Sequence, residues 1–374
     1  MKAVILVGGG GTRLRPLTTN RPKPLLPLVN KPFLDHVLFL LRTHGMTDVI
    51  LAVAYLSESF EQAYGDGSHL GMTLTYISEE EAKGTGGAIK NVEPHLNSGE
   101  SFLVFNGDIL TDLDLSDMLR MHRESESICT ISLTSVEDPS AYGVIDLEEG
   151  GRIERFTEKP KREEATSNWI NAGTYILEPE VLAHIPAGEF HMVERGLFPD
   201  LLRQGAPMYG YRTGAYWLDI GTPAKYLEAH VDLLAGRLKH SLEPEGELFT
   251  DKVWVGEGST IDEGARLSGP VVLGKGCKVH EGASIVGPTV LGDGCEVGKE
   301  AHLAGVVAWQ GATFAEKSQI HTSVIGSNAY IGEECKIEGI SIIGDDATIG
   351  TGNHLSGGIK VWPGITLPDR GVSF

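Results

Sequence analysis

The sequence predicts two unlike domains, an α/β domain followed by a parallel β-helix. Three observations carry this prediction. Residues 1–235 alternate short apolar runs with helical patterns, residues 236–250 form a polar linker that contains Pro244, and the residues after 250 repeat every six positions. The length of 374 residues also suits two domains better than one. We therefore expect the two domains at 1–235 and 251–374.

The first domain is predicted to contain a mixed, mostly parallel sheet. Its continuous apolar runs, typical of strands buried on both faces, cover residues 3–7, 49–53 and 102–105. Helical patterns cover residues 36–43, 57–64, 85–92, 192–203 and 223–235. Strand-helix-strand order indicates right-handed crossovers, and residues 128–177 are richer in strands. Binding sites in such sheets lie beyond the carboxyl ends of the strands.

The second domain has a period of six residues. Aliphatic side chains recur at Val255, Ile261, Leu267, Leu273, Val279, Ile285, Leu291, Val297 and Leu303, and again at Ile325, Ile331, Ile337, Ile343, Ile349, Leu355 and Val361. Six residues suit one flat side of a β-helix whose aliphatic side chain points inward. Small residues stand two positions earlier and include Cys277, Cys295 and Cys335, which we expect to be buried structural residues. The two series are out of phase, so a loop or a slipped coil is expected around residues 305–313.

The charge balance excludes some partners. The 51 acidic and 31 basic residues give a formal charge of −20, which repels nucleic acid. The apolar run at the start of the chain is too short for a signal peptide or a bilayer span, so we expect a cytoplasmic protein without a membrane partner. Residues 1–34, however, contain six Lys or Arg and no Asp or Glu. The positive charge of this segment indicates a local binding site for a small anion.

A cluster of four glycines follows the first apolar run, at residues 8–11. Glycines after a buried strand let backbone N–H groups approach a phosphate closely. A dinucleotide-binding fingerprint would need its third glycine at position 13 or 14, which are Arg13 and Leu14. A Walker A loop would need a Gly-Lys-Ser/Thr, which does not follow.

A longer motif surrounds this cluster. Residues 9–18 read Gly-Gly-Gly-Thr-Arg-Leu-Arg-Pro-Leu-Thr, and Pro22-Lys23-Pro24 follows. The motif resembles the signature of the sugar-1-phosphate nucleotidyltransferase family, along essentially all of residues 1–235. The six-residue repeats extend the resemblance to members with a left-handed β-helix. It implies a Rossmann-like, GT-A-like catalytic domain that joins a nucleoside triphosphate (NTP) to a sugar 1-phosphate with Mg²⁺ and releases pyrophosphate.

The resemblance also implies roles for single residues. Because the sugar phosphate attacks the α-phosphorus in line, catalysis would consist mostly of positioning and charge neutralisation. Arg13 would hold the triphosphate and the departing pyrophosphate, and Lys23 would neutralise charge on the α-phosphate. Further nucleotide-binding positions in the motif are Gly8, Gly9, Gly11 and Thr12. Asp108 and Asp219 would hold Mg²⁺, and Asp108 is therefore also a catalytic candidate.

Three short stretches resemble the sugar-phosphate site of the family. They are Tyr142-Gly143-Val144, Glu158-Lys159-Pro160 and Asn171-Ala172-Gly173. Gly143 would let the sugar lie close to the backbone, and Lys159 would pair with the sugar phosphate. Glu158 and Asn171 would form hydrogen bonds with sugar hydroxyls.

Two further positions indicate which nucleotide base the enzyme binds. Gly84-Thr85-Gly86 resembles the loop of the family beside the nucleoside, and Glu79 stands five residues before Gly84. A carboxylate only accepts hydrogen bonds. Guanine presents two neighbouring donors, whereas uracil and thymine present one donor between two acceptors. Glu79 therefore favours GTP, similar to the mannose-1-phosphate guanylyltransferases. The competing interpretation of Glu79-Glu80-Glu81 is a solvated charge run.

Other functions stay open from the sequence. Glucose 1-phosphate with a thymidine, uridine or adenine nucleotide would suit the same motifs. A bifunctional enzyme whose β-helix is an acyltransferase would need a base, for which the candidates are His280, His302, His321 and His354. A non-catalytic subunit would be expected to have lost the predicted catalytic and metal-binding residues, all of which are present. Open backbone edges at the ends of the β-helix predict a homo-oligomer.

Overall fold

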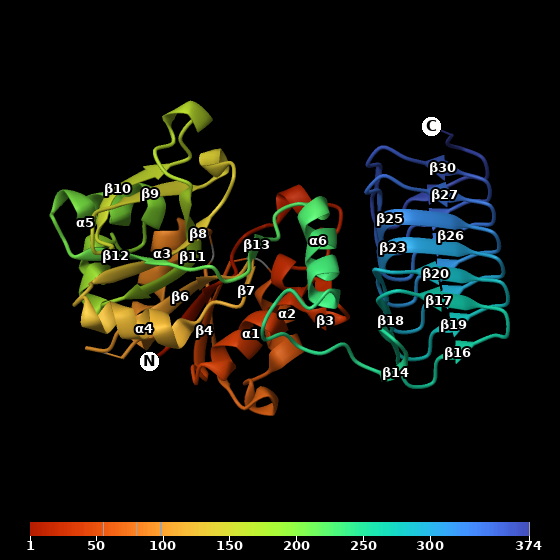
Figure 1. Ribbon diagram of the computed structural model, residues 1–374, viewed down its shortest axis with the longest axis horizontal. Helices are drawn as coiled ribbons and strands as arrows, with labels where there is room; N and C mark the ends of the chain where they lie inside the picture. Colours follow the sequence, from red (N-terminus) through yellow and green to blue (C-terminus); the bar gives the residue numbers. More distant parts are fainter. Residues whose placement is uncertain (55, 80, 98, 374) are drawn as a thin grey trace. The chain divides into compact units, whose positions relative to one another are not determined.

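A computed structural model describes residues 1–374 except 55, 80, 98 and 374 (Figure 1). The chain forms two units. The first unit comprises Met1–Gly10 and Val37–Asp219, and the second comprises Gly11–His36 and Ile220–Phe374. We call Gly11–His36, which carries most of the motif, the signature segment. These units group segments by packing, so the domain boundaries expected along the chain stay a prediction.

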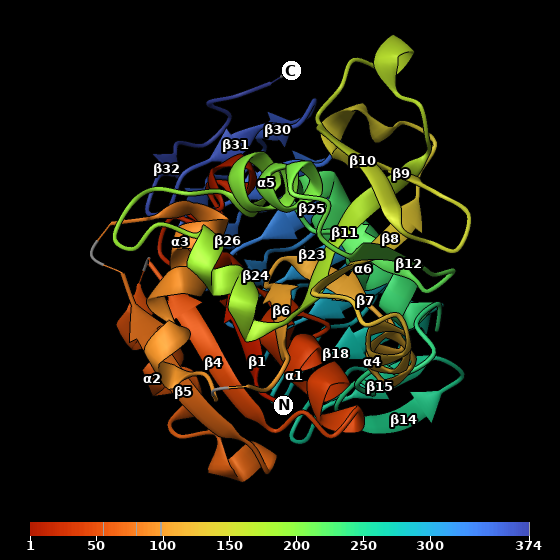
Figure 2. The same cartoon turned by 90° about the vertical axis from the view of Figure 1, so that its left-hand side faces the viewer.

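A nine-stranded mixed sheet forms the centre of the first unit. Its parallel part runs in the order β6 (Phe102–Asn106), β1 (Ala3–Leu6), β4 (Asp48–Val53) and β5 (Thr73–Ser78). These four strands lie side by side in Figure 2. The three apolar runs form β1, β4 and β6, and nearly all of their side chains are buried. The predicted parallel core of the sheet is thus confirmed.

Antiparallel strands complete the sheet. β11 (Trp169–Leu177) pairs with β6 on one side and with β8 (Cys129–Ser135) on the other. β9 (Gly143–Leu147) and β10 (Ile153–Glu158) form an antiparallel pair beyond β11, whereas β12 (Met208–Arg212) is parallel to β8. The strand-rich region expected from the sequence therefore makes the sheet mixed.

Helices connect these strands along the chain, and the last helix belongs to the second unit (Figure 1). They are α1 (Phe33–Thr43), α2 (Ser57–Tyr64), α3 (Gly84–Asn91), α4 (Leu115–Glu124), α5 (Phe198–Arg203) and α6 (Pro223–Leu234). The helix expected over 192–203 is a π-helix, η8 (Val193–Leu197), that continues into α5. The α4 helix was not predicted. Asp114 caps it, because its Oδ1 accepts a hydrogen bond from the Asp117 N–H at 2.9 Å.

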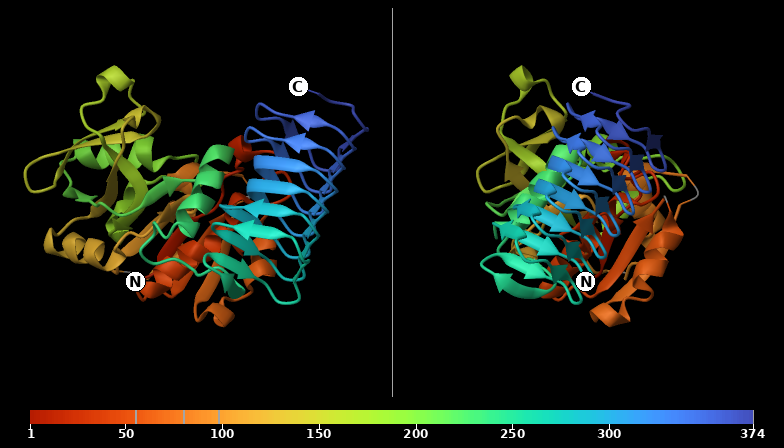
Figure 3. Two further views of the ribbon diagram at one scale, coloured as in Figure 1. Left: turned by 45° about the vertical axis from the view of Figure 1, so that its right-hand side comes forward. Right: turned by 90° about the vertical axis from the view of Figure 1, so that its right-hand side faces the viewer.

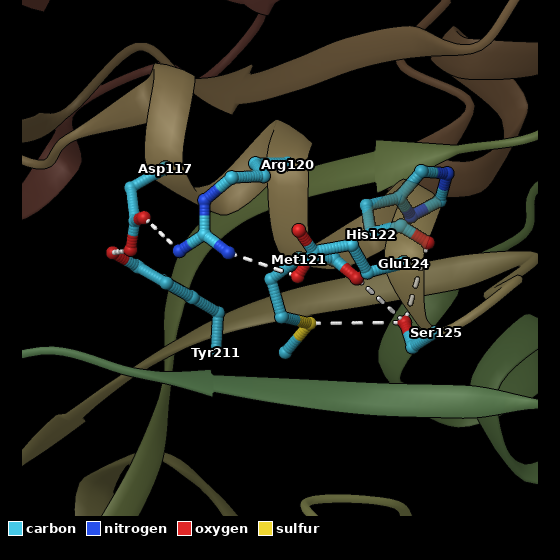
Figure 4. A network of polar contacts seen from close by, with 7 residues as sticks. All are labelled: Asp117, Arg120, Met121, His122, Glu124, Ser125 and Tyr211. Carbon is cyan, nitrogen blue, oxygen red and sulfur yellow. Dashed lines mark hydrogen bonds and ion pairs between the residues drawn. The ribbon is translucent and has the colours of Figure 1, made fainter.

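Polar contacts tie α4 to strand β12 (Figure 4). The Tyr211 hydroxyl on β12 donates to Oδ2 of Asp117 at 2.7 Å, and this bond holds the pKa of the Asp117 carboxyl below its usual value. Arg120 donates to Asp117 and, at 2.8 Å, to Oε2 of Glu124. These pairs are largely exposed, so they fix the helix orientation more than they stabilise the fold.

The residues after 250 form a β-helix in the second unit. Parallel strands stack with a step of 18 residues, as where Val253 pairs with Val271 and Thr260 pairs with Lys278. Figure 3 shows the stacked coils. Their inward side chains form one buried core that contains nearly all of the predicted six-residue series. Cys277, Cys295 and Cys335 lie in that core, as expected for structural cysteines.

The phase change is a slipped coil without an extra loop. The core series continues from Leu303 through Ala308, Phe314 and Ile320 to Ile325, all at most 1% exposed. Two six-residue units are therefore shortened to five, within β23 (His302–Ala308) and β25 (Gln319–Ile325). The first shortening lies where the sequence predicts it, and the second lies beyond that region.

Among the described residues, no helix has both the length and the apolar character needed to cross a membrane.

Candidate active site

The carboxyl ends of the parallel strands bring predicted residues to one edge of the first unit. Leu6, the last residue of β1, pairs with Asn106, the last residue of β6. The Gly107 N–H donates to the Leu6 carbonyl at 3.0 Å. The glycines after β1 and Asp108 after β6 therefore leave the sheet side by side. Ligands bind at this edge in open α/β sheets.

The glycines after β1 have different surroundings. A Cβ added to Gly8 would lie 3.1 Å from the Cβ of Ala54, so Gly8 allows the loop to pass close to the end of β4. Gly9 and Gly10 are exposed, and a Cβ added to either would meet no described atom within 4 Å. The backbone at Gly9 and Gly10 is thus accessible to a ligand such as a phosphate.

The structure brings the backbone segments of Asp108 and Asp219 next to each other. Strand β7 (Ile109–Thr111) pairs antiparallel with β13 (Trp217–Asp219), and Asp219 lies opposite Ile109, the residue after Asp108. Both carboxylates are half-buried. Among the described residues, no three His, Cys, Asp or Glu side chains gather as a complete metal site. Mg²⁺ commonly binds through one or two carboxylates, water and substrate phosphates, so this pair fits that ion.

The signature segment presents Arg13 on a constrained backbone. Gly11 has a left-handed φ of 54°, and a Cβ there would lie 2.9 Å from Cγ2 of Thr18. The Thr18 hydroxyl donates to the Gly11 carbonyl at 2.8 Å. Leu14 is buried, whereas Thr12 and Arg13 are exposed. The segment thus anchors itself through apolar residues and leaves the guanidinium accessible.

Lys23 begins a short 3-10 helix (Lys23–Leu25) and is 8% exposed. The flanking Pro22 and Pro24 are buried as well, so the backbone around this ammonium group is well fixed. Arg13 and Lys23 belong to the second unit, and Asp108 and Asp219 belong to the first. Their convergence around one phosphorus atom stays a prediction.

Glu79 follows β5 and is 8% exposed, which contradicts the interpretation of a solvated charge. Its Oε2 accepts a hydrogen bond from the Lys83 N–H at 3.3 Å. Its Oε1 is buried without a hydrogen-bond partner among the described residues. Burial raises the pKa of this carboxyl, and the Lys83 N–H offsets part of the increase. A buried acceptor without a partner is costly unless a ligand supplies a donor.

Thr85 joins the predicted nucleoside loop to a residue that the sequence did not single out. Gly84 and Thr85 begin α3, and the Thr85 hydroxyl donates to Oε2 of Glu194 at 2.9 Å. The same hydroxyl accepts from the Val193 N–H at 3.0 Å. Burial raises the pKa of Glu194, and Glu158 and Lys159 are among its charged neighbours. A lone Glu within a predicted helical pattern gives no sequence signal for this position.

Gly143 and Glu158 lie directly opposite each other on β9 and β10. A Cβ on Gly143 would lie 2.5 Å from Cζ of Phe156 and 3.1 Å from Oε2 of Glu158, so only glycine fits without a shift. Lys159 follows with a positive φ of 49° and is exposed. Its Nζ lies 3.7 Å from Oε1 of Glu158. The predicted sugar-phosphate residues of this stretch are therefore neighbours.

Asn171 stabilises an irregularity in β11. Its Nδ2 donates to the Tyr175 hydroxyl at 3.0 Å, and its Oδ1 accepts from the Gly173 N–H at 2.9 Å. The pairing of β11 with β8 shifts register between Asn171 and Tyr175. The indole N–H of Trp217, on the strand that ends at Asp219, donates to the Ala172 carbonyl at 2.9 Å. These bonds link the Asn171 stretch to the strand of Asp219.

The first unit therefore places an accessible glycine-rich backbone, Asp108 and a buried acceptor at the carboxyl edge of the large sheet, and Asp219 on a strand that pairs next to Asp108. Backbone N–H groups and carboxylates in this arrangement define a phosphate-handling α/β enzyme, here with a β-helix attached. The chain belongs to the nucleotidyl transferase family, which matches residues 2–236. Residues 250–355 match the LbH domain described for EIF2B subunit epsilon, which agrees with the left-handed β-helix expected from the repeats.

Similar proteins of known name narrow the activity expected within this family. A mannose-1-phosphate guanylyltransferase of Mycobacterium tuberculosis is 40% identical over 71% of this chain and 78% of its own length. Mannose-1-phosphate guanylyltransferase 1 of Arabidopsis thaliana is 34% identical over 100% of this chain and 97% of its own. The crystal structure of HddC from Yersinia pseudotuberculosis, complexed with GMP-PN, has a TM-score of 0.53 and 30% identity, and covers 61% of this chain and 97% of HddC. Nucleotidyl transfer to a sugar 1-phosphate is thus the activity of this enzyme.

Proposed function

We propose that the enzyme transfers GMP from GTP to mannose 1-phosphate and forms GDP-mannose and pyrophosphate with Mg²⁺. The single observation that carries the choice of base is Glu79, a buried carboxylate with one oxygen that lacks a described partner. The names of relatives that match most of the chain support mannose 1-phosphate as acceptor. The complex of HddC with GMP-PN agrees with a guanine nucleotide.

Glu79 would accept hydrogen bonds from N1–H and N2–H of guanine. Its Oε2 already accepts from Lys83, which leaves Oε1 as the free acceptor, and Oε2 can accept a second bond. Uracil or thymine would place a carbonyl oxygen against this carboxylate. That contact would leave two acceptors facing each other in a buried site.

Four kinds of group would contact the phosphates: a guanidinium, backbone N–H groups, an ammonium and a carboxylate-bound metal ion. Arg13 is exposed and would form a bidentate contact with the triphosphate, and the Gly9 and Gly10 backbone would contact the same group. Lys23 would place its charge beside the α-phosphate. Asp108 and Asp219 would hold Mg²⁺, which would neutralise charge on the phosphate oxygens. The sugar phosphate oxygen then displaces pyrophosphate without a covalent enzyme intermediate.

The sugar would lie beside Gly143 and Glu158, where the missing side chain of Gly143 lets Glu158 and Phe156 pack against the backbone. Glu158 would accept from sugar hydroxyls, and the exposed Lys159 would swing from Glu158 to the sugar phosphate. Asn171 already uses both ends of its amide inside β11, so its contribution would be limited to the remaining lone pair and N–H.

Two of the four candidate histidines of the β-helix, His280 and His354, contact carboxylates, which counts against either of them as the base of an acyltransferase. His280 contacts Asp262 through Nδ1 at 3.2 Å and Glu296 through Nε2 at 2.8 Å, so both ring nitrogens are engaged in ties between coils. His354 contacts Glu338 through Nε2 alone, at 3.3 Å. These contacts raise the pKa of His280 and favour its charged form, which is a poor general base.

The proposal is tested by pyrophosphate release. The protein is incubated with Mg²⁺, each of ATP, CTP, GTP, UTP and dTTP, and a panel of sugar 1-phosphates that includes mannose and glucose. GTP with mannose 1-phosphate should give the highest kcat/KM, and EDTA should abolish turnover. A higher kcat/KM with UTP or dTTP than with GTP would refute the assignment of guanine. Turnover that persists in EDTA would refute the requirement for Mg²⁺.

A further inference from the structure

The β-helix is connected to the signature segment by a series of buried hydrogen bonds. Trp309 follows β23 and is 2% exposed, and its indole N–H donates to the Tyr226 hydroxyl at 3.1 Å. Tyr226, on α6, is 1% exposed, and its hydroxyl donates in turn to the Pro27 carbonyl. The phenol thus accepts on one side and donates on the other. Its two bonds connect a coil of the β-helix to the signature segment inside the second unit.

A second coil holds the same segment at a tight turn. β2 (Pro27–Leu28) and β3 (Lys31–Pro32) form a short hairpin, and both turn residues have positive φ, 51° at Val29 and 62° at Asn30. A β-branched residue is strained in this region and persists there only where its surroundings fix it. The Val29 N–H donates to Nδ1 of His230 on α6 at 3.3 Å. Asn30 Nδ2 donates to the Leu291 carbonyl in the β-helix at 2.8 Å.

A third contact lies next to the predicted catalytic lysine. The Arg21 guanidinium stacks over the Trp309 ring, with its central carbon 4.9 Å from the ring centroid. Such a stack fixes a long side chain that would otherwise be free. Arg21 and Pro27 flank Lys23 on both sides in the sequence. The β-helix and α6 together therefore contact the segment on both sides of Lys23.

We propose that the β-helix is a working part of the catalytic apparatus, because its contacts through Trp309 and with Asn30 hold the signature segment in the position that nucleotidyl transfer requires. Trp309 and Asn30 are then positioning residues. The proposal rests on the roles proposed for Arg13 and Lys23. A displacement of about 1 Å in a positioning element can lower the rate about 100-fold, so loss of one anchoring contact is enough to be measured.

Two variants separate anchoring from folding. Trp309→Phe keeps an aromatic ring but removes the N–H that reaches Tyr226. Asn30→Gly keeps a residue that tolerates positive φ but removes the amide that reaches Leu291. Phe314→Leu is the matched control, because Phe314 is fully buried in the β-helix core and lies outside these contacts. Each protein is studied as the full chain.

Three measurements are made on each variant: the Tm, amide hydrogen exchange of peptides from residues 21–31, and kcat and KM for pyrophosphate release. Trp309→Phe and Asn30→Gly should each speed exchange in residues 21–31 about 10-fold and lower kcat by about 5-fold or more. The KM for the sugar 1-phosphate should change less than about 2-fold, because its predicted contacts come from the first unit. Phe314→Leu should lower the Tm and leave the exchange and kcat unchanged.

The proposal is overturned if Trp309→Phe and Asn30→Gly behave like Phe314→Leu, with a lower Tm but unchanged kcat and unchanged exchange in residues 21–31. It is also overturned if exchange rises while kcat does not fall, since the segment would then not need its anchor. The assay uses whichever NTP and sugar 1-phosphate the wild type turns over fastest. A wrong assignment of guanine or mannose therefore shows in the wild type and leaves this comparison intact.

Discussion

The exchange of Glu79 for glutamine tests the assignment of the base. Glu79→Gln keeps the size of the side chain and replaces one carboxylate oxygen with an NH₂ group. Guanine would lose one charge-assisted hydrogen bond and would face a donor with its own N–H. The carboxylate is only 8% exposed, so little water can replace the lost contact.

The expected effect follows from the cost of such a bond. Hydrogen bonds to charged groups contribute about 1.5–3 kcal/mol, and a loss of 2–3 kcal/mol lowers kcat/KM for GTP about 30–150-fold. The kcat/KM for UTP should rise, because a glutamine amide can both donate a hydrogen bond to uracil and accept one from it. The ratio of kcat/KM for GTP to that for UTP should therefore fall at least about 100-fold.

The assay is pyrophosphate release at saturating sugar 1-phosphate, with GTP and UTP varied separately. Glu81→Gln is the matched control, since Glu81 belongs to the same acidic run but is exposed. The control should leave the GTP/UTP ratio unchanged. If Glu79→Gln leaves that ratio unchanged as well, the carboxylate does not read the base and the argument for guanine fails.

Three further predictions concern the charged residues of the site, the stability of the fold at acidic pH, and the oligomeric state. Lys23→Ala and Asp108→Asn should each lower kcat about 100-fold or more, and near-normal pyrophosphate release by either variant would remove that residue from the mechanism. Burial lowers the pKa of His36 to about 4 and of His230 to about 3, so both stay neutral in the folded protein while the unfolded chain binds protons below pH 6.5. The free energy of unfolding in urea should therefore decrease as pH falls from 6.5 toward 4, by up to about 1.4 kcal/mol per pH unit for each histidine, and a flat profile would contradict this. An exposed edge strand, β14 (Glu247–Thr250), pairs with the first strand of the β-helix, so light scattering at micromolar concentration should detect a homo-oligomer, and a monomer would count against that expectation.

Periodic patterns predicted the fold well, because each reflects one repeated packing environment. The apolar runs became β1, β4 and β6, and the six-residue series became the β-helix core. The second shortened unit was missed because Ile320 and Ile325 are five residues apart, and a search at a period of six does not register that step. The α4 helix was also missed, although Leu115 and Met118 form its buried face.

The candidate site was predictable where a motif lies on consecutive residues and less so where it depends on pairing. The backbones at Asp108 and Asp219 are neighbours because β7 and β13 pair across more than 100 residues of sequence, which no local pattern reveals. Glu194 gave no signal, because its importance arises only from its contact with Thr85. The anchoring of the signature segment was equally hidden, since Trp309 is almost 300 residues away from Pro27. The sequence alone left two interpretations of Glu79, a ligand contact and a solvated charge. The burial of its side chain excludes the solvated charge.

The most direct test of the account follows the oxygen atoms of the sugar phosphate. Mannose 1-phosphate labelled with ¹⁸O on the three non-bridging phosphate oxygens is incubated with GTP and Mg²⁺, and the products are separated and weighed by mass spectrometry. Attack of the sugar phosphate on the α-phosphorus predicts that GDP-mannose retains all of the label and that an equal amount of unlabelled pyrophosphate appears. Label in the pyrophosphate, or release of inorganic phosphate in its place, would contradict nucleotidyl transfer at this site.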